Sequence, residues 1–142
     1  MRIPRVNSVA AALTNPSIIW YPAMLEESPD QSPIDTVRQC LLKLASRFEV
    51  KESIIVDRLL AATDALRARK QALFVEMEEI VFKAMCQLWP QPKKQPSLRL
   101  VATIAIGVMR VSMEGWRQDN GKRSLVKFLE ENFSILKAGI LK

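Results

Sequence analysis

The chain has 142 residues, of which 49% are hydrophobic, 25% charged and 6% aromatic. This composition is typical of a helix-rich globular protein and unlike that of a disordered or fibrous chain. The sequence contains no histidine and only 4 glycines, so it lacks the commonest general base, the commonest metal ligand and a glycine-rich phosphate loop. Its net charge of +6 is spread along the chain, which favours a solvated surface over a nucleic-acid footprint. We therefore expect an all-α domain that is not an enzyme and binds no metal or cofactor.

Prolines punctuate the first third of the chain, among them Pro4, Pro16 and Pro22. Proline removes a backbone donor and disfavours a helical conformation in the residue before it. Residues 1–31 are therefore predicted to form an irregular arm, with at most one short helix at about residues 6–14. Residues 21–31 of this arm are predicted to be a linker to the main domain, residues 32–142.

A helix start signal opens the main domain at Ser32. Serine caps a helix, Pro33 suits its first turn, and the carboxylate of Asp35 favours the positive end of the helix dipole. The apolar spacing that follows predicts a helix to about residue 48. Further helices are expected at about residues 52–65, 66–89, 98–120 and 124–140, with a proline-rich break after the third of these five helices.

Two other sequence features bear on the cellular compartment. Cys40 and Cys86 are too few for a disulfide scaffold and lie in apolar helical patterns, so we expect reduced, buried thiols in a cytoplasmic protein. The longest apolar stretch, residues 101–109, is about half the length of a bilayer span. We therefore expect no membrane segment.

The helix expected at residues 98–120 has two apolar faces when successive residues are placed about 100° apart. One face carries Leu98, Ala102, Ala105, Ile106, Met109, Met113 and Trp116. The roughly opposite face carries Leu100, Val101, Ile104, Val108, Val111 and Gly115. The first face suits the chain's own core, so the second needs another buried surface, most economically a copy of the same helix.

The last expected helix is also apolar over nearly half its circumference, which is wider than one neighbour requires. We therefore expect a homodimer, with a seam lined by Leu100, Ile104, Val108, Val111, Leu129 and Phe133. Gly107 and Gly115 would permit close approach of the two copies. The alternative is that both faces of the 98–120 helix are covered within one subunit.

A ligand cavity is a further hypothesis, because thioether and aromatic side chains suit an adaptable apolar pocket. The candidate ligand-binding residues are Phe74, Met77, Glu78, Met85, Met109, Met113 and Trp116. For each apolar residue taken singly, core packing is the favoured interpretation. Glu78 or Arg110 is a candidate anchor for a polar ligand group. Arg110 and Glu114 are spaced i, i+4, however, and are expected to pair with each other.

From Ser32 onward the chain resembles the C-terminal regulatory domain of TetR-type transcriptional repressors. The resemblance rests on Ser32-Pro33-Ile34, residues 58–69, the alanine-rich helix that ends in Trp116, Asp119-Asn120-Gly121, Ser124-Leu125 and residues 128–133. It implies a helical bundle of about five to six helices, whose last two pair with those of a second subunit in a dimeric four-helix bundle. It also implies a cavity for a small apolar or amphipathic effector.

Members of that family read DNA through an N-terminal helix-turn-helix, which residues 1–31 are too short to supply. We expect the chain to reach DNA only through a helix-turn-helix that it does not contain, either as a fragment or isolated effector domain or because the module was lost. Two other functions stay open. One is a ligand-free helical protein–protein interaction module, and the other is a nucleic-acid binder that uses Arg2, Arg5 and scattered lysines.

Overall fold

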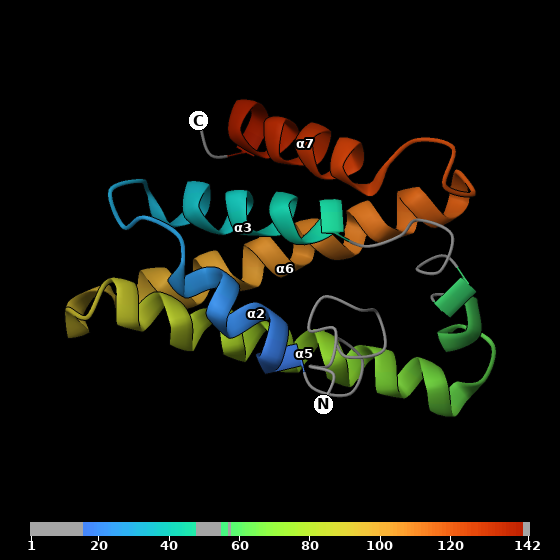
Figure 1. Cartoon of the computed structure of the whole chain (residues 1–142), viewed down its shortest axis with the longest axis horizontal. Helices are drawn as coiled ribbons and strands as arrows, with labels where there is room; N and C mark the ends of the chain where they lie inside the picture. The colour runs from blue at the N-terminus through green and yellow to red at the C-terminus, as the bar shows by residue number, and fades with distance from the viewer. Residues whose placement is uncertain (1–15, 48–54, 57, 141–142) are drawn as a thin grey trace, which may run out of the picture.

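The computed structural model describes residues 16–47, 55–56 and 58–140, and every regular element in this part of the chain is helical (Figure 1). The predicted all-α class is confirmed. The elements are α2 (Pro16–Leu25), α3 (Pro33–Arg47), α5 (Asp64–Leu88), the 3-10 turn η1 (Pro92–Lys94), α6 (Gln95–Gln118), α7 (Leu125–Ile135) and the π-helical turn η2 (Leu136–Ile140). The helix expected at residues 6–14 lies outside the described residues. Positions 52–54 and 57 of the helix expected at residues 52–65 also lie outside them.

The prediction of an irregular arm over residues 1–31 is wrong for α2, and the expected linker shortens to residues 26–32. Pro16 lies at the start of α2, where its missing N–H is not needed, and Pro22 within the helix is exposed. A proline inside a helix costs about 3 kcal/mol. Burial of each large apolar side chain contributes roughly 1.5–3 kcal/mol, and α2 buries three against the core beside α5 (Figure 1). These side chains are Ile19, Trp20 and Met24.

Hydroxyl caps fix where three of the helices begin. The Ser32 Oγ accepts a hydrogen bond from the Asp35 backbone N–H at 3.3 Å and donates one to the Asp35 carboxylate at 3.0 Å, as the sequence predicts for α3. The hydroxyls of Thr63 and Ser124 cap α5 and α7 in the same way. Lys137 of η2 also donates to the Asp35 carboxylate and lowers the pKa of that carboxyl.

Helix α6 is the central helix, because it packs against α3, α5 and α7 (Figure 1). It runs antiparallel to α5, since Arg99 donates to Glu79 at 2.6 Å while Arg110 donates to Gln71 at 2.6 Å. Where α6 meets α7, the Asn132 side-chain amide donates to the buried Ser112 hydroxyl at 2.9 Å. The two helices are therefore joined by a satisfied polar pair inside an otherwise apolar contact.

The structure places the two apolar faces of α6 in different environments. Its buried residues are Leu98, Ala102, Ala105, Ile106, Met109, Ser112 and Trp116, which is the predicted core face with Ser112 in place of the half-buried Met113.

Helix α6 ends at Gln118, and Asn120 and Gly121 follow with φ of 55° and 70°. The Gly121 N–H donates back to the Trp116 carbonyl at 3.1 Å, so the predicted stop signal acts as a C-terminal cap.

One stretch of the described residues, Pro92–Gln118, is long and apolar enough to cross a membrane by length and composition alone. The core helix of a soluble protein meets the same two criteria. Here the stretch contains α6, which packs on three other helices and carries charged side chains such as Arg99, Arg110 and Glu114.

Candidate functional site

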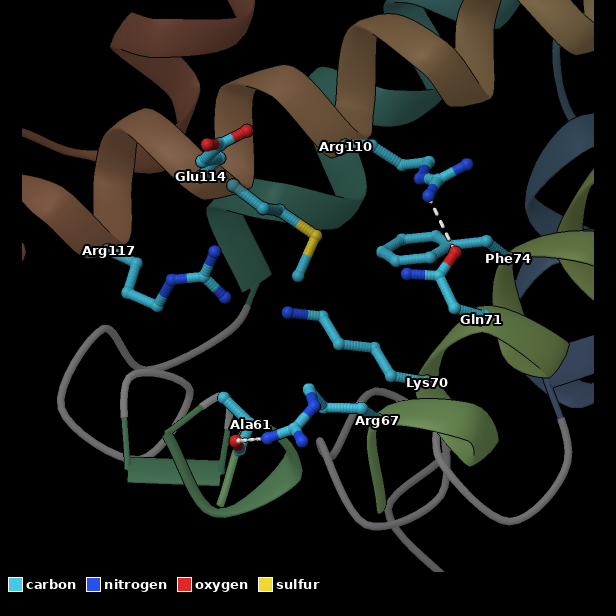
Figure 2. Close-up of a pocket in the computed structure, with 9 residues that line it drawn as sticks. Ala61, Arg67, Lys70, Gln71, Phe74, Arg110, Glu114 and Arg117 are labelled. Atoms are coloured by element: carbon cyan, nitrogen blue, oxygen red, sulfur yellow. Dashed lines mark hydrogen bonds between the residues drawn. The ribbon is translucent and has the colours of Figure 1, made fainter. Parts of the chain in front are cut away.

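A pocket of about 260 Å³ opens between the first half of α5 and the second half of α6 (Figure 2). The antiparallel contact of these helices brings residues about 40 positions apart in the sequence to the same place. The pocket is lined by Ala61, Arg67, Lys70, Gln71, Phe74, Arg110, Met113, Glu114 and Arg117. It is a candidate binding site in the part of the chain that the structure describes.

Positive charge dominates the pocket. Among the described residues that line it, four are cationic and one, Glu114, carries a carboxylate. Lys70 and Arg117 extend from α5 and α6 toward the same space (Figure 2). Arg67 is held at the rim, because it donates to the Ala61 carbonyl at 2.8 Å and pairs with Asp64.

Phe74 and Met113 form an apolar wall in the pocket. The Phe74 side chain is buried, and the Arg110 guanidinium lies over its ring, 4.9 Å from the centroid. Gln71 accepts a hydrogen bond from that guanidinium (Figure 2). The half-buried thioether of Met113 adds a second apolar surface. The pocket therefore combines an apolar wall with a cationic mouth.

A second candidate site is the outer face of α6, which we define as Leu100, Ile104, Val108 and Val111. Leu100 is 64% exposed and Val111 59% exposed, while the two residues between them are half-buried. Ile135 of α7 is 62% exposed. It lies seven residues after Phe128, so the two share the side of α7 that faces α6. Ile135 is thus a further exposed apolar side chain, on a helix that packs against α6.

The sequence model of the MftR C-terminal domain, a TetR-family C-terminal domain, matches residues 31–141. The chain belongs to this family. The comparisons with curated proteins and with solved structures find no match. The resemblance to a TetR C-terminal domain, drawn from Ser32 onward, is therefore confirmed over nearly the same residues.

Of the seven ligand-binding residues predicted for this TetR-family domain, Phe74 and Met113 line the pocket. The other five do not. Met85, Met109 and Trp116 are buried in the core, and Met77 packs partly buried against it. Glu78 is half-buried on α5 and does not line the pocket. For these apolar residues, core packing is the role that the structure gives.

The predicted pairing of Arg110 with Glu114 is wrong. Arg110 instead donates to Gln71 and stacks on Phe74, both on α5. An i, i+4 pair contributes only about 0.2–0.5 kcal/mol on an exposed helix. A charged hydrogen bond to a neighbouring helix contributes about 1.5–3 kcal/mol, so the contact between helices prevails.

Two residues of the predicted dimer seam belong to the core of the subunit in this structure. Leu129 and Phe133 are buried inside the subunit, where α7 packs on α3 and α6. The wide apolar arc of α7 is thus needed for two neighbours in its own chain. A Cβ on Gly115 would approach the Phe128 ring to 3.0 Å, so this glycine serves the α6–α7 contact, whereas Gly107 faces open space.

Sequence reasoning missed most of the cationic lining. The missed charges are Arg67, Lys70 and Arg117, together with the neutral Gln71. Their signal is the i, i+3, i+4, i+7 spacing: 67, 70, 71 and 74 share one side of α5, and 110, 113, 114 and 117 share one side of α6. Each set taken alone resembles an ordinary solvated stripe. Among the described residues, no group of three His, Cys, Asp or Glu side chains comes together to hold a metal ion.

Proposed function

We propose that this chain is the effector-binding and dimerisation part of a TetR-type transcriptional regulator and acts as a homodimer. The observation that carries the proposal is that two sides of α6 have different roles. One side of the helix lines the pocket and an adjacent side presents the outer face. The proposed effector is a small apolar or amphipathic compound. On this account the chain is not an enzyme and requires no cofactor.

Exposed apolar area supports the dimer. Monomeric proteins rarely leave a contiguous row of large apolar side chains in water, and both Leu100 and Val111 are more than half exposed. Gly107, next to Val108 in the sequence, leaves room for a second backbone to approach. Two copies of α6 and α7 would then meet as a four-helix bundle.

The position of the pocket supports a route from effector to partner. Arg110 lines the pocket, and the next residue, Val111, lies on the outer face. A ligand that moves this part of α6 changes how two copies fit together, and dimerisation changes ligand affinity by the same factor. We propose that the regulator reaches DNA through a helix-turn-helix.

Two further observations bear on the proposal. The pocket, with Phe74 and Met113 in its wall, favours a ligand-binding domain over a ligand-free interaction module. Cys40 and Cys86 are both free thiols, which supports the cytoplasm as the site of action.

We expect the purified chain to sediment at twice the mass of one chain at micromolar concentration, because burial of the outer face in a second copy removes apolar area from water. Sedimentation equilibrium over a concentration series measures this mass directly. The mass of a single chain at every concentration would contradict the proposed dimer.

A further inference from the structure

We infer that Arg110 competes with the effector for the Phe74 ring, and that the effector is a planar, ring-containing compound with an N–H or O–H donor. The effector binds by displacing the Arg110 guanidinium from that ring. This inference rests on the proposed function, in which the pocket binds an effector. It adds the chemical class of the effector and the contact that opposes its binding.

The contacts of Arg110 carry the first step. Its guanidinium lies over the Phe74 ring, 4.9 Å from the centroid, and donates to the Gln71 side-chain oxygen at 2.6 Å. All three residues line the pocket (Figure 2). The flat surface on which an aromatic ligand would stack is therefore already occupied by a flat group of the protein itself.

A second arginine of α6 makes the same kind of contact more firmly. The Arg99 guanidinium lies 3.8 Å from the centroid of Phe82 and donates to Glu79 at 2.6 Å. In both contacts the ring lies three residues after the acceptor on α5. The hydrogen bond from Arg99 lowers the pKa of the Glu79 carboxyl, and a carboxylate attracts a guanidinium by a full charge that an amide lacks.

The contact of Arg110 is thus the easier one to release. Arg110 lies farther from its ring than Arg99 does, its acceptor is a neutral amide, and both Gln71 and Arg110 are exposed. A released guanidinium enters water, so it incurs no cost of burial. Phe74 is buried in the core cluster, so the ring keeps its place when the arginine leaves. Of the two contacts, the weaker one lies in the pocket.

The displaced group defines the ligand that replaces it. A guanidinium is planar and directs its N–H donors within that plane. The replacement must be flat to stack on Phe74 and must carry a donor to restore the hydrogen bond of Gln71. The Met113 thioether in the same pocket also suits a ring. An aromatic compound with an N–H or O–H group on its ring meets these requirements.

Isothermal titration calorimetry of the full chain with indole and 1-methylindole tests the inference. The two probes share one ring system, and only indole has an N–H donor. Removal of an internal competitor raises the apparent affinity, because a larger fraction of the protein is competent to bind. We expect Arg110→Ala to bind indole about fivefold more tightly than the wild type does, and about fivefold more tightly than it binds 1-methylindole, the equivalent of one hydrogen bond.

Two further variants separate competition from a general effect on the fold. Gln71→Glu gives Arg110 a charged acceptor and leaves every side chain of α6 in place, so it should weaken indole binding about threefold. Arg99→Ala is the matched control, because it removes the corresponding arginine outside the pocket, and should leave the indole affinity unchanged. Circular dichroism establishes that the variants are folded. Opposite shifts at Arg110 and Gln71 are not expected of residues that only stabilise the subunit.

Equal indole affinity of the wild type, Arg110→Ala and Gln71→Glu would overturn the competition while the effector pocket stands. Failure of folded Arg110→Ala to bind indole would also overturn it, since the Phe74 ring is then uncovered. Equal binding of the two probes by Arg110→Ala would overturn the donor class of the effector. If Arg110→Ala fails to fold, Gln71→Glu decides the matter, and the sedimentation mass tests the proposed dimer separately.

Discussion

Replacing Phe133 by alanine is expected to lower the free energy of unfolding by about 3–5 kcal/mol, as measured by urea denaturation at a fixed protein concentration. The Phe133 side chain is fully buried, in the core cluster that α7 shares with α3 and α6. Its removal loses the transfer free energy of the ring and leaves a cavity that the packed helices fill only in part. A loss of this size is a large fraction of the stability of a small domain.

Val75→Ala is the control for Phe133→Ala. Val75 is 68% exposed on α5, so its truncation should change the stability by less than about 0.5 kcal/mol. The pair also separates the two assignments of Phe133. If Phe133→Ala left the subunit as stable as the wild type and only dissociated the dimer, this residue would belong to the seam and not to the core.

Replacing Val111 by glutamate is expected to convert the dimer to a monomer at micromolar concentration. Val111 is 59% exposed on the outer face of α6, so the subunit tolerates a carboxylate there. In a dimer the substitution would bury two unpaired carboxylates, one from each copy, and an uncompensated buried charge costs about 3–5 kcal/mol. A cost of this size weakens association by about two to four orders of magnitude.

Val75→Glu is the matched control for Val111→Glu, because the same residue type is replaced at a similarly exposed site on a different helix. Sedimentation equilibrium should show that Val75→Glu retains the wild-type mass. Circular dichroism establishes that both variants are folded. A dimeric Val111→Glu together with a monomeric Val75→Glu would move the partner surface from α6 to α5.

How much of the fold follows from the sequence depends on how local each signal is. The buried and open faces of α6 were predictable, because helical periodicity over more than twenty residues is a strong signal. The starts of α3 and α7 at Ser32 and Ser124 were encoded within one turn. Helix α2 was not predictable by the same reasoning, since its prolines signal a break and only the tertiary burial of Trp20 and its neighbours outweighs them.

The candidate site was less predictable than the fold. Phe74 and Met113 were found from their chemistry, but the charges around them lie on two helices and become neighbours only when α5 and α6 pack. The spread of charge along the sequence therefore concealed a local concentration in space. The burial of Leu129 and Phe133 inside the subunit was hidden for a related reason, because the sequence shows that a helix is widely apolar without showing which neighbours cover it.

Thiol accessibility gives a direct measure of whether a second copy covers the outer face of α6. Burial raises the pKa of Cys40 to about 12, so this thiol stays protonated and unreactive at neutral pH. Cys86 is half-buried. In the labelling experiment Cys86 is therefore replaced by serine. In that background, Val111→Cys reports the outer face and Val75→Cys serves as the exposed reference.

The central claim is that α6 serves the pocket of its own chain on one side and a second copy of itself on another. The measurement that tests it most directly is the rate of maleimide labelling of the two variant thiols over a range of protein concentrations. The account predicts that the thiol at position 111 reacts slowly at high concentration and, on dilution, reaches the rate of the thiol at position 75. Equal rates at every concentration would show that the outer face is open to water and would contradict the account.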